Sequence, residues 1–300
     1  MNPNWSDIVA GGIEFSGDPR FVLFIGTPRS GHSIIGAILD SHRSAVVSHE
    51  VNALEKVSQG LGRKDLLSAI IENSRAQALA GRSQSDADHA AGYGQQLSGE
   101  GDEAYSQRLA NLPTPDSYRF DYAIPGHFQG RTEGGIRVIG DKKGGGTTKM
   151  LAQDSTLLKR FEKIVEMPID LIHVIRDPYD NISTMARRTG TRVSRQVSRY
   201  EWLCEQIGLV LDSCDNRVFH IHHEDFVSSP SRVIEDLFTW LGLSLESDHI
   251  AACSSIVYEK PHRSRLLSDW EDGDKDSVES MIERWEFLRE YQSDGSHASV

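Results

Sequence analysis

The sequence predicts an α/β protein built on a parallel β-sheet, with helices packed on both faces in three layers. Continuous apolar runs of strand length recur along the chain, as expected for parallel strands that are buried on both faces. Segments with helical periodicity lie between several of these runs, which is the pattern of βαβ units. The five predicted strands are Phe21–Ile25, Ala45–Ser48, Ile136–Ile139, Leu171–Ile175 and Val218–Ile221. The clearest helical segments are Ile34–Leu39, Leu157–Val165 and Val233–Leu241.

The 300 residues fit one large domain, with a core from about residue 20 to about residue 290. An insertion occupies about residues 60–130. Leu61–Leu79 has helical character, but Arg82–Gly101 is rich in Gly, Ser, Asp, Gln and Ala and holds almost no large apolar side chain. Such a composition cannot bury enough surface to order itself, so we expect a partly mobile insertion of helix and loop, with a plain surface loop as the alternative. The tail Gln292–Val300 is expected to fray.

Composition excludes several classes of protein. The 32 Lys and Arg against 44 Asp and Glu leave a net charge of −12, which argues against general nucleic-acid binding. No apolar run approaches the roughly 18 residues that span a bilayer, and no secretory signal is visible, so we expect a cytoplasmic protein. The three cysteines, Cys204, Cys214 and Cys253, have no C-x-x-C spacing and support neither a disulfide framework nor a cysteine zinc site.

A phosphate-loop pattern follows the first predicted strand. Gly26–Ser33 reads Gly-Thr-Pro-Arg-Ser-Gly-His-Ser, which has the G-x-x-x-x-G-x-S spacing and opens the helical run Ile34–Asp40. Glycines allow the tight turn through which successive amides and a helix N-terminus face one anion. His32 stands where an NTPase carries Lys, which argues against phosphoryl transfer, and Arg29 supplies a different cation. A glycine turn without a ligand is the alternative.

A second anion-binding pattern follows the fourth predicted strand. Arg176 stands at the carboxyl end of this strand, where α/β sheets bind ligands. Asp177 is a good N-cap and Pro178 a good first residue, so a helix is predicted to begin here. Thr184 and Arg188 share one face of this helix, and the Arg188 side chain leans back toward Arg176. Two guanidinium groups and a hydroxyl suit a phosphate dianion; a surface helix with local salt bridges is the alternative.

Together these motifs resemble the sulfotransferases that use 3′-phosphoadenosine 5′-phosphosulfate (PAPS). Their P-[KR]-S-G-T-[ST] loop is similar to Pro28–Ser33, and their Arg-Asp-Pro motif with a hydroxyl residue eight positions on is similar to Arg176–Thr184. A third block, Tyr-Glu-Asp-Leu followed by a helix and Leu-Gly-Leu, is similar to His223–Phe226 with Leu241–Leu243. The resemblance covers about residues 20–60 and 136–290. It implies a sulfotransferase with a P-loop-like parallel sheet.

Tyrosylprotein-type members of that family look nearest. They carry a Glu 21 residues past the loop Arg, as Glu50 is past Arg29, and a second Arg twelve residues past the first, as Arg188 is past Arg176. The segment Lys260–Trp270 has the length of their Lys-Pro…Leu-Ser-Lys-Trp block, but Asp replaces its Lys. The departures from the family pattern are His32, His223 and Asp269. Bacterial sulfotransferases of unknown acceptor share most of these features, so the resemblance identifies the donor better than the acceptor.

The resemblance implies how PAPS would be held. The amides of Ser30, Gly31, His32 and Ser33 and the Arg29 guanidinium would bind the 5′-phosphosulfate and stabilise the departing phosphate. Arg176, Thr184 and Arg188 would bind the 3′-phosphate, with Ser183 as the alternative to Thr184 if the helix register differs. Arg265 would reach the same phosphate from the C-terminal segment. The products would be adenosine 3′,5′-bisphosphate and a sulfated acceptor, and no metal is required.

The resemblance also implies catalytic groups for in-line transfer to an acceptor hydroxyl. Glu50 would accept the acceptor proton, and burial would have to raise its pKa from near 4.3. His49 is the rival base, and Glu50 as a simple helix N-terminal charge is the alternative. Lys142 would stabilise the sulfate, with a solvated lysine pair as the alternative. The insertion would shape the pocket for a phenol, sugar, lipid or small-metabolite hydroxyl.

Three other interpretations compete with this one. A non-catalytic anion-binding protein on the same fold would keep both anion motifs but not need Glu50. A nucleotide kinase would need Lys in place of His32. The run His220–Asp225 places two histidines on one strand face, as in some metal sites, but nothing distant completes such a site.

Overall fold

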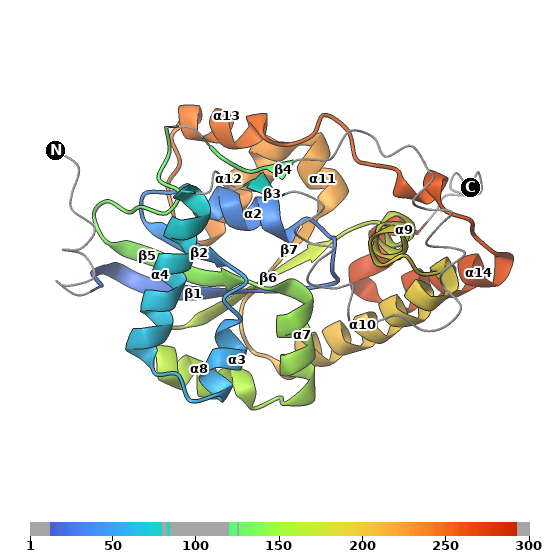
Figure 1. Cartoon of the computed structure of the whole chain (residues 1–300), viewed down its shortest axis with the longest axis horizontal. Coiled ribbons are helices and arrows are strands. Elements are labelled where there is room, and N and C mark those ends of the chain that lie inside the picture. The colour runs from blue at the N-terminus through green and yellow to red at the C-terminus, as the bar shows by residue number, and fades with distance from the viewer. Residues whose placement is uncertain (1–12, 80–82, 85–119, 125, 293–300) are drawn as a thin grey trace.

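The computed structural model of the protein describes residues 13–79, 83–84, 120–124 and 126–292 (Figure 1). Its main sheet has five strands in the order β2-β5-β1-β6-β7, and every neighbouring pair is parallel. The strands are β1 (Phe15–Ile25), β2 (Ala45–His49), β5 (Ile136–Lys142), β6 (Ile169–Ile175) and β7 (Val218–His222). Each predicted apolar run lies within one of them, so the predicted parallel sheet is confirmed. A two-stranded antiparallel pair joins β3 (Ser83–Gln84) to β4 (Phe120–Asp121).

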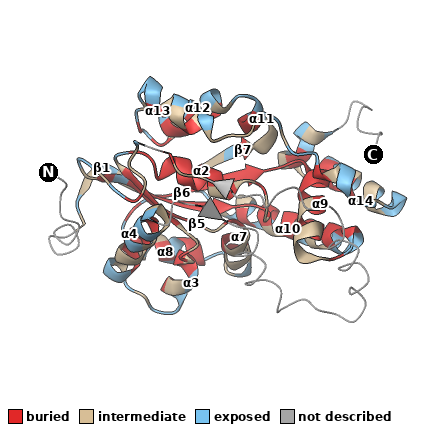
Figure 2. Ribbon diagram, turned by 45° about the horizontal axis from the view of Figure 1, so that its top comes forward, coloured by how far each residue is buried: buried red, intermediate tan, exposed pale blue. Residues whose placement is uncertain are grey.

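Helices cover both faces of this sheet, as the three-layer prediction requires. Along β1, Phe21, Leu23 and Ile25 pack into one core, and Val22 and Phe24 pack into the core on the opposite face. The first core is closed by α3 (Ala53–Ser58), α4 (Arg63–Leu79), α7 (Gly144–Gln153) and α8 (Leu157–Val165). The second is closed by α2 (His32–Leu39), α11 (His223–Ser228), α12 (Pro230–Trp240) and α13 (Ser247–Ser255). Both faces of the strands are therefore buried (Figure 2), which explains why the runs are continuous rather than alternating.

A third core lies beyond the carboxyl end of β6 (Figure 1). It is formed by α9 (Pro178–Thr189), α10 (Val193–Ser213), α14 (Asp272–Arg284) and η2 (Glu286–Tyr291), and η1 (Ser264–Leu267) packs on α9. The C-terminal part of the chain thus returns to the edge of the sheet at which the strands end.

The predicted helix boundaries follow from local chemistry. Asp177 caps α9 by accepting a hydrogen bond from the Asp180 amide at 3.2 Å, and Pro178 occupies the first turn. Gly190 ends the helix in the left-handed conformation, with φ of 64°. Leu61–Leu79 contains α4 as predicted. The predicted mobile stretch Arg82–Gly101 lies almost entirely outside the described residues, as does nearly all of the C-terminal tail.

None of the helices within the described ranges is both long enough and apolar enough to cross a membrane.

Candidate active site

The loop that joins β1 to α2 turns tightly through three residues with positive φ. These are Gly26 (133°), Arg29 (71°) and Gly31 (103°). Inside the turn the Ser30 hydroxyl donates to the Thr27 carbonyl at 2.9 Å and lies 2.7 Å from the Thr27 hydroxyl. The first amides of a helix are not used within the helix itself. The loop therefore leaves the first amides of α2 available, which is the geometry that an anion site of the predicted kind needs.

Helices that follow the two neighbouring strands hold this loop in place. The Gly26 amide donates to Thr148 Oγ1 of α7 at 2.9 Å, and Asn181 Nδ2 of α9 donates to Ser30 Oγ at 2.9 Å. Ser30 is fully buried. The loop conformation is thus set by side chains from α7 and α9, so it does not depend on a ligand for its shape.

The His32 side chain has a structural role. Its Nε2 lies 3.0 Å from the Ile25 carbonyl, which can only accept, so Nε2 carries the proton. Burial lowers the pKa of His32 to about 4, and the ring is neutral near pH 7. A Cβ on Gly144 would lie 2.6 Å from this ring, so the glycine at the start of α7 makes room for it. His32 therefore cannot replace the cation of an NTPase lysine, and only its backbone amide is available for the predicted role.

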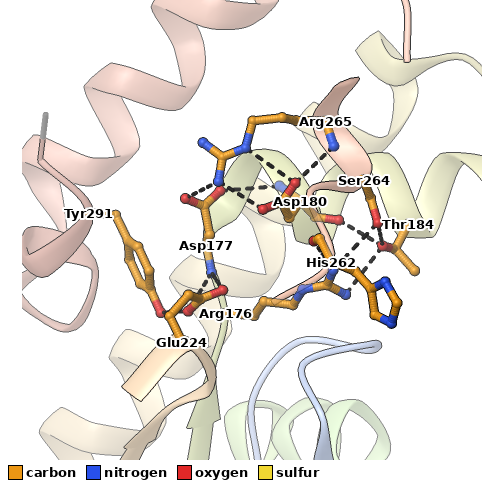
Figure 3. A network of polar contacts seen from close by, with 9 residues as sticks. All are labelled: Arg176, Asp177, Asp180, Thr184, Glu224, His262, Ser264, Arg265 and Tyr291. Carbon is orange, nitrogen blue, oxygen red and sulfur yellow. Dashed lines mark hydrogen bonds and ion pairs between the residues drawn. The ribbon is translucent and has the colours of Figure 1, made fainter. Parts of the chain in front are cut away.

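Arg176 connects the two predicted anion motifs, and Figure 3 shows its contacts with Thr184, His262 and Ser264. Its Nη1 donates to the Arg29 carbonyl and to Thr184 Oγ1, both at 3.2 Å. Its Nη2 donates to the His262 carbonyl at 3.1 Å and to Ser264 Oγ at 3.4 Å. Thr184 and Ser264 are themselves 3.0 Å apart through their hydroxyl oxygens. The phosphate loop, the start of α9 and the C-terminal segment therefore meet at one guanidinium group, and sequence reasoning missed the contribution of Ser264.

The buried polar atoms beside the loop that have no hydrogen-bond partner among the described residues include Arg176 Nε and His223 Nδ1. His223 Nδ1 would lie 2.8 Å from a Cβ on Gly31, so the ring edge rests on the loop. Burial, reinforced by the charges of Arg176 and His262, lowers the pKa of His223 to about 3. An unsatisfied buried polar group costs on the order of 1–3 kcal/mol. A ligand that satisfies these atoms would recover this energy.

Glu50 and Lys142 meet at the carboxyl ends of β2 and β5. Lys142 Nζ donates to Glu50 Oε1 at 3.0 Å and lies 3.3 Å from His49 Nε2. Lys143 Nζ donates to Glu50 Oε2 at 2.8 Å. The sequence predicted Glu50 and Lys142 as catalytic groups and His49 as the rival base, and the structure brings these three side chains together. Lys143 was missed, although its position beside Lys142 in the sequence could have indicated it.

The pKa of Glu50 shifts in the direction opposite to the expected one. Burial alone would raise it, but Lys142 and Lys143 outweigh burial and hold it well below its ordinary value. The Glu50 side chain is still 34% exposed, whereas that of Lys142 is only 4% exposed. The carboxylate is therefore ionised at neutral pH and bound by two ammonium groups. The expectation of a raised pKa was wrong for this state because it considered burial without the neighbouring charges.

A glycine within α2 makes room for the Lys142 side chain. A Cβ on Gly36 would lie 3.0 Å from Lys142 Cγ. Glycine in the interior of a helix is unfavourable by about 0.5–1 kcal/mol relative to alanine, so close packing of this kind accounts for its presence. Lys142 thus passes beside the helix whose N-terminus forms the phosphate loop.

Comparison with known proteins identifies the family. A model of the sulfotransferase family matches residues 19–247, which is most of the chain and includes the loop, Glu50, Lys142 and Arg176. The chain belongs to the sulfotransferase family. Membership of this family indicates sulfuryl transfer as the class of reaction. No curated protein matches the chain significantly.

Solved structures similar to this sulfotransferase include three proteins described as sulfotransferases. The sulfotransferase domain of the Synechococcus PCC 7002 olefin synthase is 15% identical, with 94% of this chain and 96% of that one covered and a TM-score of 0.44. A sulfotransferase from Mycobacterium avium is 13% identical, with coverages of 92% and 77% and a TM-score of 0.44. A mouse sulfotransferase complexed with PAP is 9% identical, with coverages of 93% and 86% and a TM-score of 0.43.

The Arg265 side chain of the sulfotransferase is paired with two aspartates at the start of α9. Its Nη2 lies 2.6 Å from Asp177 Oδ2 and 2.7 Å from Asp180 Oδ2, and its amide donates to Asp180 Oδ1 at 2.8 Å. Burial alone would lower the pKa of Arg265, but the two carboxylates raise it. The guanidinium is therefore bound by two aspartates. Its position anchors η1 on α9 (Figure 3), next to the Arg176 partners His262 and Ser264, and the phosphate contact expected of Arg265 stays a prediction.

Ser183 and Arg188 lie on different sides of α9. Ser183 is fully buried and its Oγ has no partner among the described residues, so Thr184 is the hydroxyl that meets Arg176. Arg188 is half-buried. Burial raises the pKa of the Tyr122 phenol, and the charges of Arg29 and Arg188 oppose this rise. The guanidinium groups of Arg29 and Arg188 therefore both lie close enough to the Tyr122 phenol to influence its pKa.

Glu224 supports the second anion motif, and sequence reasoning missed it. Its carboxylate accepts the Asp177 amide at 3.2 and 3.3 Å and the Tyr291 hydroxyl at 2.6 Å (Figure 3). It thus fixes the turn that follows Arg176. The Glu of the His-Glu-Asp-Phe block was the available signal.

The two histidines considered as metal ligands, His220 and His222, contact other side chains. His220 Nδ1 lies 3.2 Å from His173 Nδ1, and His222 Nδ1 lies 3.3 Å from a Glu290 carboxylate oxygen. Within the part of the chain that the structure describes, no group of three or more His, Cys, Asp or Glu side chains is arranged to hold a metal ion.

Proposed function

We propose that this sulfotransferase takes its sulfuryl group from PAPS and transfers it to an acceptor hydroxyl, with Glu50 as the general base. The observation that carries the proposal is the Arg176 guanidinium. Its Nη1 donates to the carbonyl of Arg29 in the phosphate loop and to Thr184 on α9, so the two anion motifs form one continuous site. A donor with a 5′-phosphosulfate and a 3′-phosphate has anionic groups for both parts of such a site.

The residues present fit this donor. The amides of Ser30–Ser33 and the Arg29 guanidinium would hold its 5′ end, since a helix N-terminus and a cation both favour an anion. Arg176, Thr184 and Arg188 would hold its 3′-phosphate. Ser264 adds a second hydroxyl, because its Oγ lies 3.0 Å from that of Thr184.

The unsatisfied atoms support the same assignment. Arg176 Nε is buried without a partner among the described residues, although both Nη groups of this side chain are hydrogen bonded. A phosphate at this position would give Nε an acceptor. Charge-assisted bonds from a guanidinium to a phosphate are shorter and stronger than bonds to a neutral carbonyl, so Arg176 gains by exchanging the His262 carbonyl for a phosphate oxygen.

Bound PAPS would supply an activated sulfuryl group that is ready for in-line transfer. Glu50 would receive the proton of the acceptor hydroxyl. Because Lys142 and Lys143 hold the pKa of Glu50 low, it is ionised but weakly basic. The proton would therefore move late, after bonding to sulfur has made the hydroxyl acidic. Lys142 would also neutralise negative charge near the transferred group, since its ammonium lies 3.0 Å from Glu50.

Calorimetric titration tests the donor. Adenosine 3′,5′-bisphosphate should bind without magnesium and ADP should bind much more weakly, because ADP lacks the 3′-phosphate. Arg176→Ala should weaken bisphosphate binding about 10- to 100-fold, the equivalent of losing about 1.5–3 kcal/mol of charged hydrogen bonding. Arg160→Ala is the matched control, since this exposed arginine of α8 pairs with Asp154. A preference for ADP, or binding of neither nucleotide, refutes the PAPS assignment.

Replacement of the base separates the enzyme from a non-catalytic anion-binding protein. Acceptors would be screened with labelled PAPS, and Glu50→Gln should lower turnover about 100-fold with bisphosphate affinity unchanged. If Glu50→Gln retains full turnover, the base is His49 or another group. Tight bisphosphate binding with no transfer to any phenol, sugar, lipid or small-metabolite acceptor supports the non-catalytic alternative. A kinase is disfavoured because His32 is buried and neutral.

A further inference from the structure

The backbone that carries Glu50 is strained. Glu50 and Asn52 both have φ of 62°, in the left-handed region that residues with a side chain rarely adopt. For Glu50 this conformation costs roughly 1–2 kcal/mol, whereas Asn adopts the left-handed region more readily than most residues with a side chain. A strained Glu persists only where the surroundings determine the backbone strongly, and such sites cluster where function demands a set geometry.

One buried carboxylate accounts for this turn. Asp141 is 1% exposed, and its Oδ1 accepts the Val51 amide at 2.9 Å while its Oδ2 accepts the Ala53 amide at 2.9 Å. These two amides are the ones that directly follow Glu50 and Asn52. A third donor, the Ser48 hydroxyl, lies 2.8 Å from Oδ1. Asp141 therefore binds one amide within this segment, one amide directly after it, and the Ser48 hydroxyl two residues before Glu50.

The arrangement places three consecutive residues of the chain around one side chain. Asp141 accepts the two backbone amides at positions 51 and 53, just after Glu50, and Lys142 and Lys143 hold the two oxygens of the Glu50 carboxylate. Strands β2 and β5 pair in register here, with Ser48 opposite Asp141 and His49 opposite Lys142. The turn at the end of β2 is thus built on the end of β5.

We infer that Asp141 is a positioning residue for sulfuryl transfer: it holds the Glu50 turn in its strained conformation and so determines where the base meets the acceptor hydroxyl. This inference rests on the proposed role of Glu50. Asp141 acts through the backbone and has no contact with donor or acceptor. Its loss should therefore impair the chemical step and leave donor binding intact.

Asp141→Asn tests the inference, since it preserves shape but replaces one acceptor oxygen with a donor. Misplacement of a reacting group by about 1 Å can cost about 100-fold in rate, so turnover should fall about 10- to 100-fold. Bisphosphate affinity should stay within about twofold, because the three donors that Asp141 binds all lie at the end of β2 and none belongs to the phosphate loop. In hydrogen exchange, the segment that contains the Val51 and Ala53 amides should exchange faster than in the wild type.

Asp40→Asn is the matched control. Asp40 is also fully buried and accepts two backbone amides, those of Val47 at 2.6 Å and Gly130 at 3.0 Å, together with the Ser74 hydroxyl. None of these three partners belongs to the Glu50 turn. Asp40→Asn should lower stability but leave exchange at the turn and the turnover of the folded protein unchanged.

A double-mutant cycle separates positioning from general structural support. Combined with Glu50→Gln, Asp141→Asn should lower turnover no further, because the group that it positions is already disabled. Additive losses overturn the inference, and so does wild-type turnover of folded Asp141→Asn. Should Asp141→Asn not fold, Ser48→Ala removes one of the three donors and must lower turnover without changing bisphosphate affinity. Failure of the proposed function is distinct, because Glu50→Gln alone would then retain turnover.

Discussion

Replacement of Arg265 by alanine should destabilise the protein before any ligand is added. The guanidinium is 11% exposed and bridges two carboxylates, those of Asp177 and Asp180, which are 6% and 3% exposed. Arg265→Ala would leave both carboxylates buried without this cation. The backbone bond from residue 265 to Asp180 would survive, so the loss is confined to the side chain.

The expected cost can be estimated from the burial. Removing one partner of a buried ion pair typically costs about 3–5 kcal/mol, because an uncompensated charge remains. For a chain of this size, 1 kcal/mol corresponds to about 2–4 °C in Tm. Arg265→Ala should therefore lower Tm by about 10 °C and shift the urea midpoint correspondingly. It should also weaken bisphosphate binding, because His262 and Ser264 lose their anchor beside Arg176.

Thermal and urea unfolding without nucleotide provide the assay. Asp180→Asn should cost less after Arg265→Ala than in the wild type, since the two residues share one interaction. If Arg265 instead contacts the 3′-phosphate directly, its replacement should affect nucleotide binding and leave stability almost unchanged. In that case Arg265→Ala would leave Tm within about 2 °C of wild type and would specifically abolish the preference for adenosine 3′,5′-bisphosphate over AMP. That outcome would refute the anchoring role.

Three further predictions follow from the site. Gly31→Ala should weaken bisphosphate binding about tenfold, measured by calorimetry, because φ of 103° strains an alanine and its Cβ would lie 2.8 Å from His223 Nδ1. Lys143→Ala should raise the pKa of Glu50, so the acid limb of the kcat/KM profile moves to higher pH by about one unit. His32→Gln should make the protein less sensitive to acid. The pKa of His32 is about 4 in the folded protein and 6.5 in the unfolded chain, so the neutral ring favours the folded state above pH 6.5. This contribution to the free energy of unfolding, about 3 kcal/mol, is lost as the pH falls from 6.5 to 4.

The first two of these predictions have control variants, and the third has a defined contradicting outcome. Gly60 also has positive φ, at 94°, but no atom lies within 4 Å of its Cβ position, so Gly60→Ala should lower stability and leave binding unchanged. Lys159 is an exposed lysine of α8, and Lys159→Ala should leave the pH profile in place. An unfolding free energy of His32→Gln that falls as steeply as that of wild type below pH 6.5 contradicts the role assigned to this ring.

The sheet was predictable because its strands are buried on both faces. In β6, all seven residues are buried, and four of the five residues in Leu171–Ile175 are aliphatic, so the segment is recognisable whichever face a residue occupies. Arg176 and Thr184 could be paired from sequence because a capped helix begins between them. Arg176 lies just before this helix and Thr184 lies in its second turn. Their spacing in the sequence therefore indicated two groups that are 3.2 Å apart in the structure.

The missed features depend on contacts between distant segments. Arg265 is one of several basic residues in its segment, and nothing local indicates that Asp177 and Asp180 surround it. The pKa of Glu50 depends on Lys142 and Lys143, which lie 92 and 93 residues away and reach it only because β2 and β5 are neighbours. Strand order is not encoded in local patterns, so the balance between burial and charge could not be predicted.

The four oxygen atoms that accept from Arg176 are made at very different times during synthesis. Those of Arg29 and Thr184 belong to the part of the chain that also contains four of the five sheet strands, whereas those of His262 and Ser264 come only after α13 has ended at Ser255. A nascent chain can therefore pair every strand while Arg176 still has half of its partners missing. The two hydrogen bonds that Arg176 Nη2 donates can form only once the C-terminal segment has been synthesised, and a chain truncated after α13 would lack both of them.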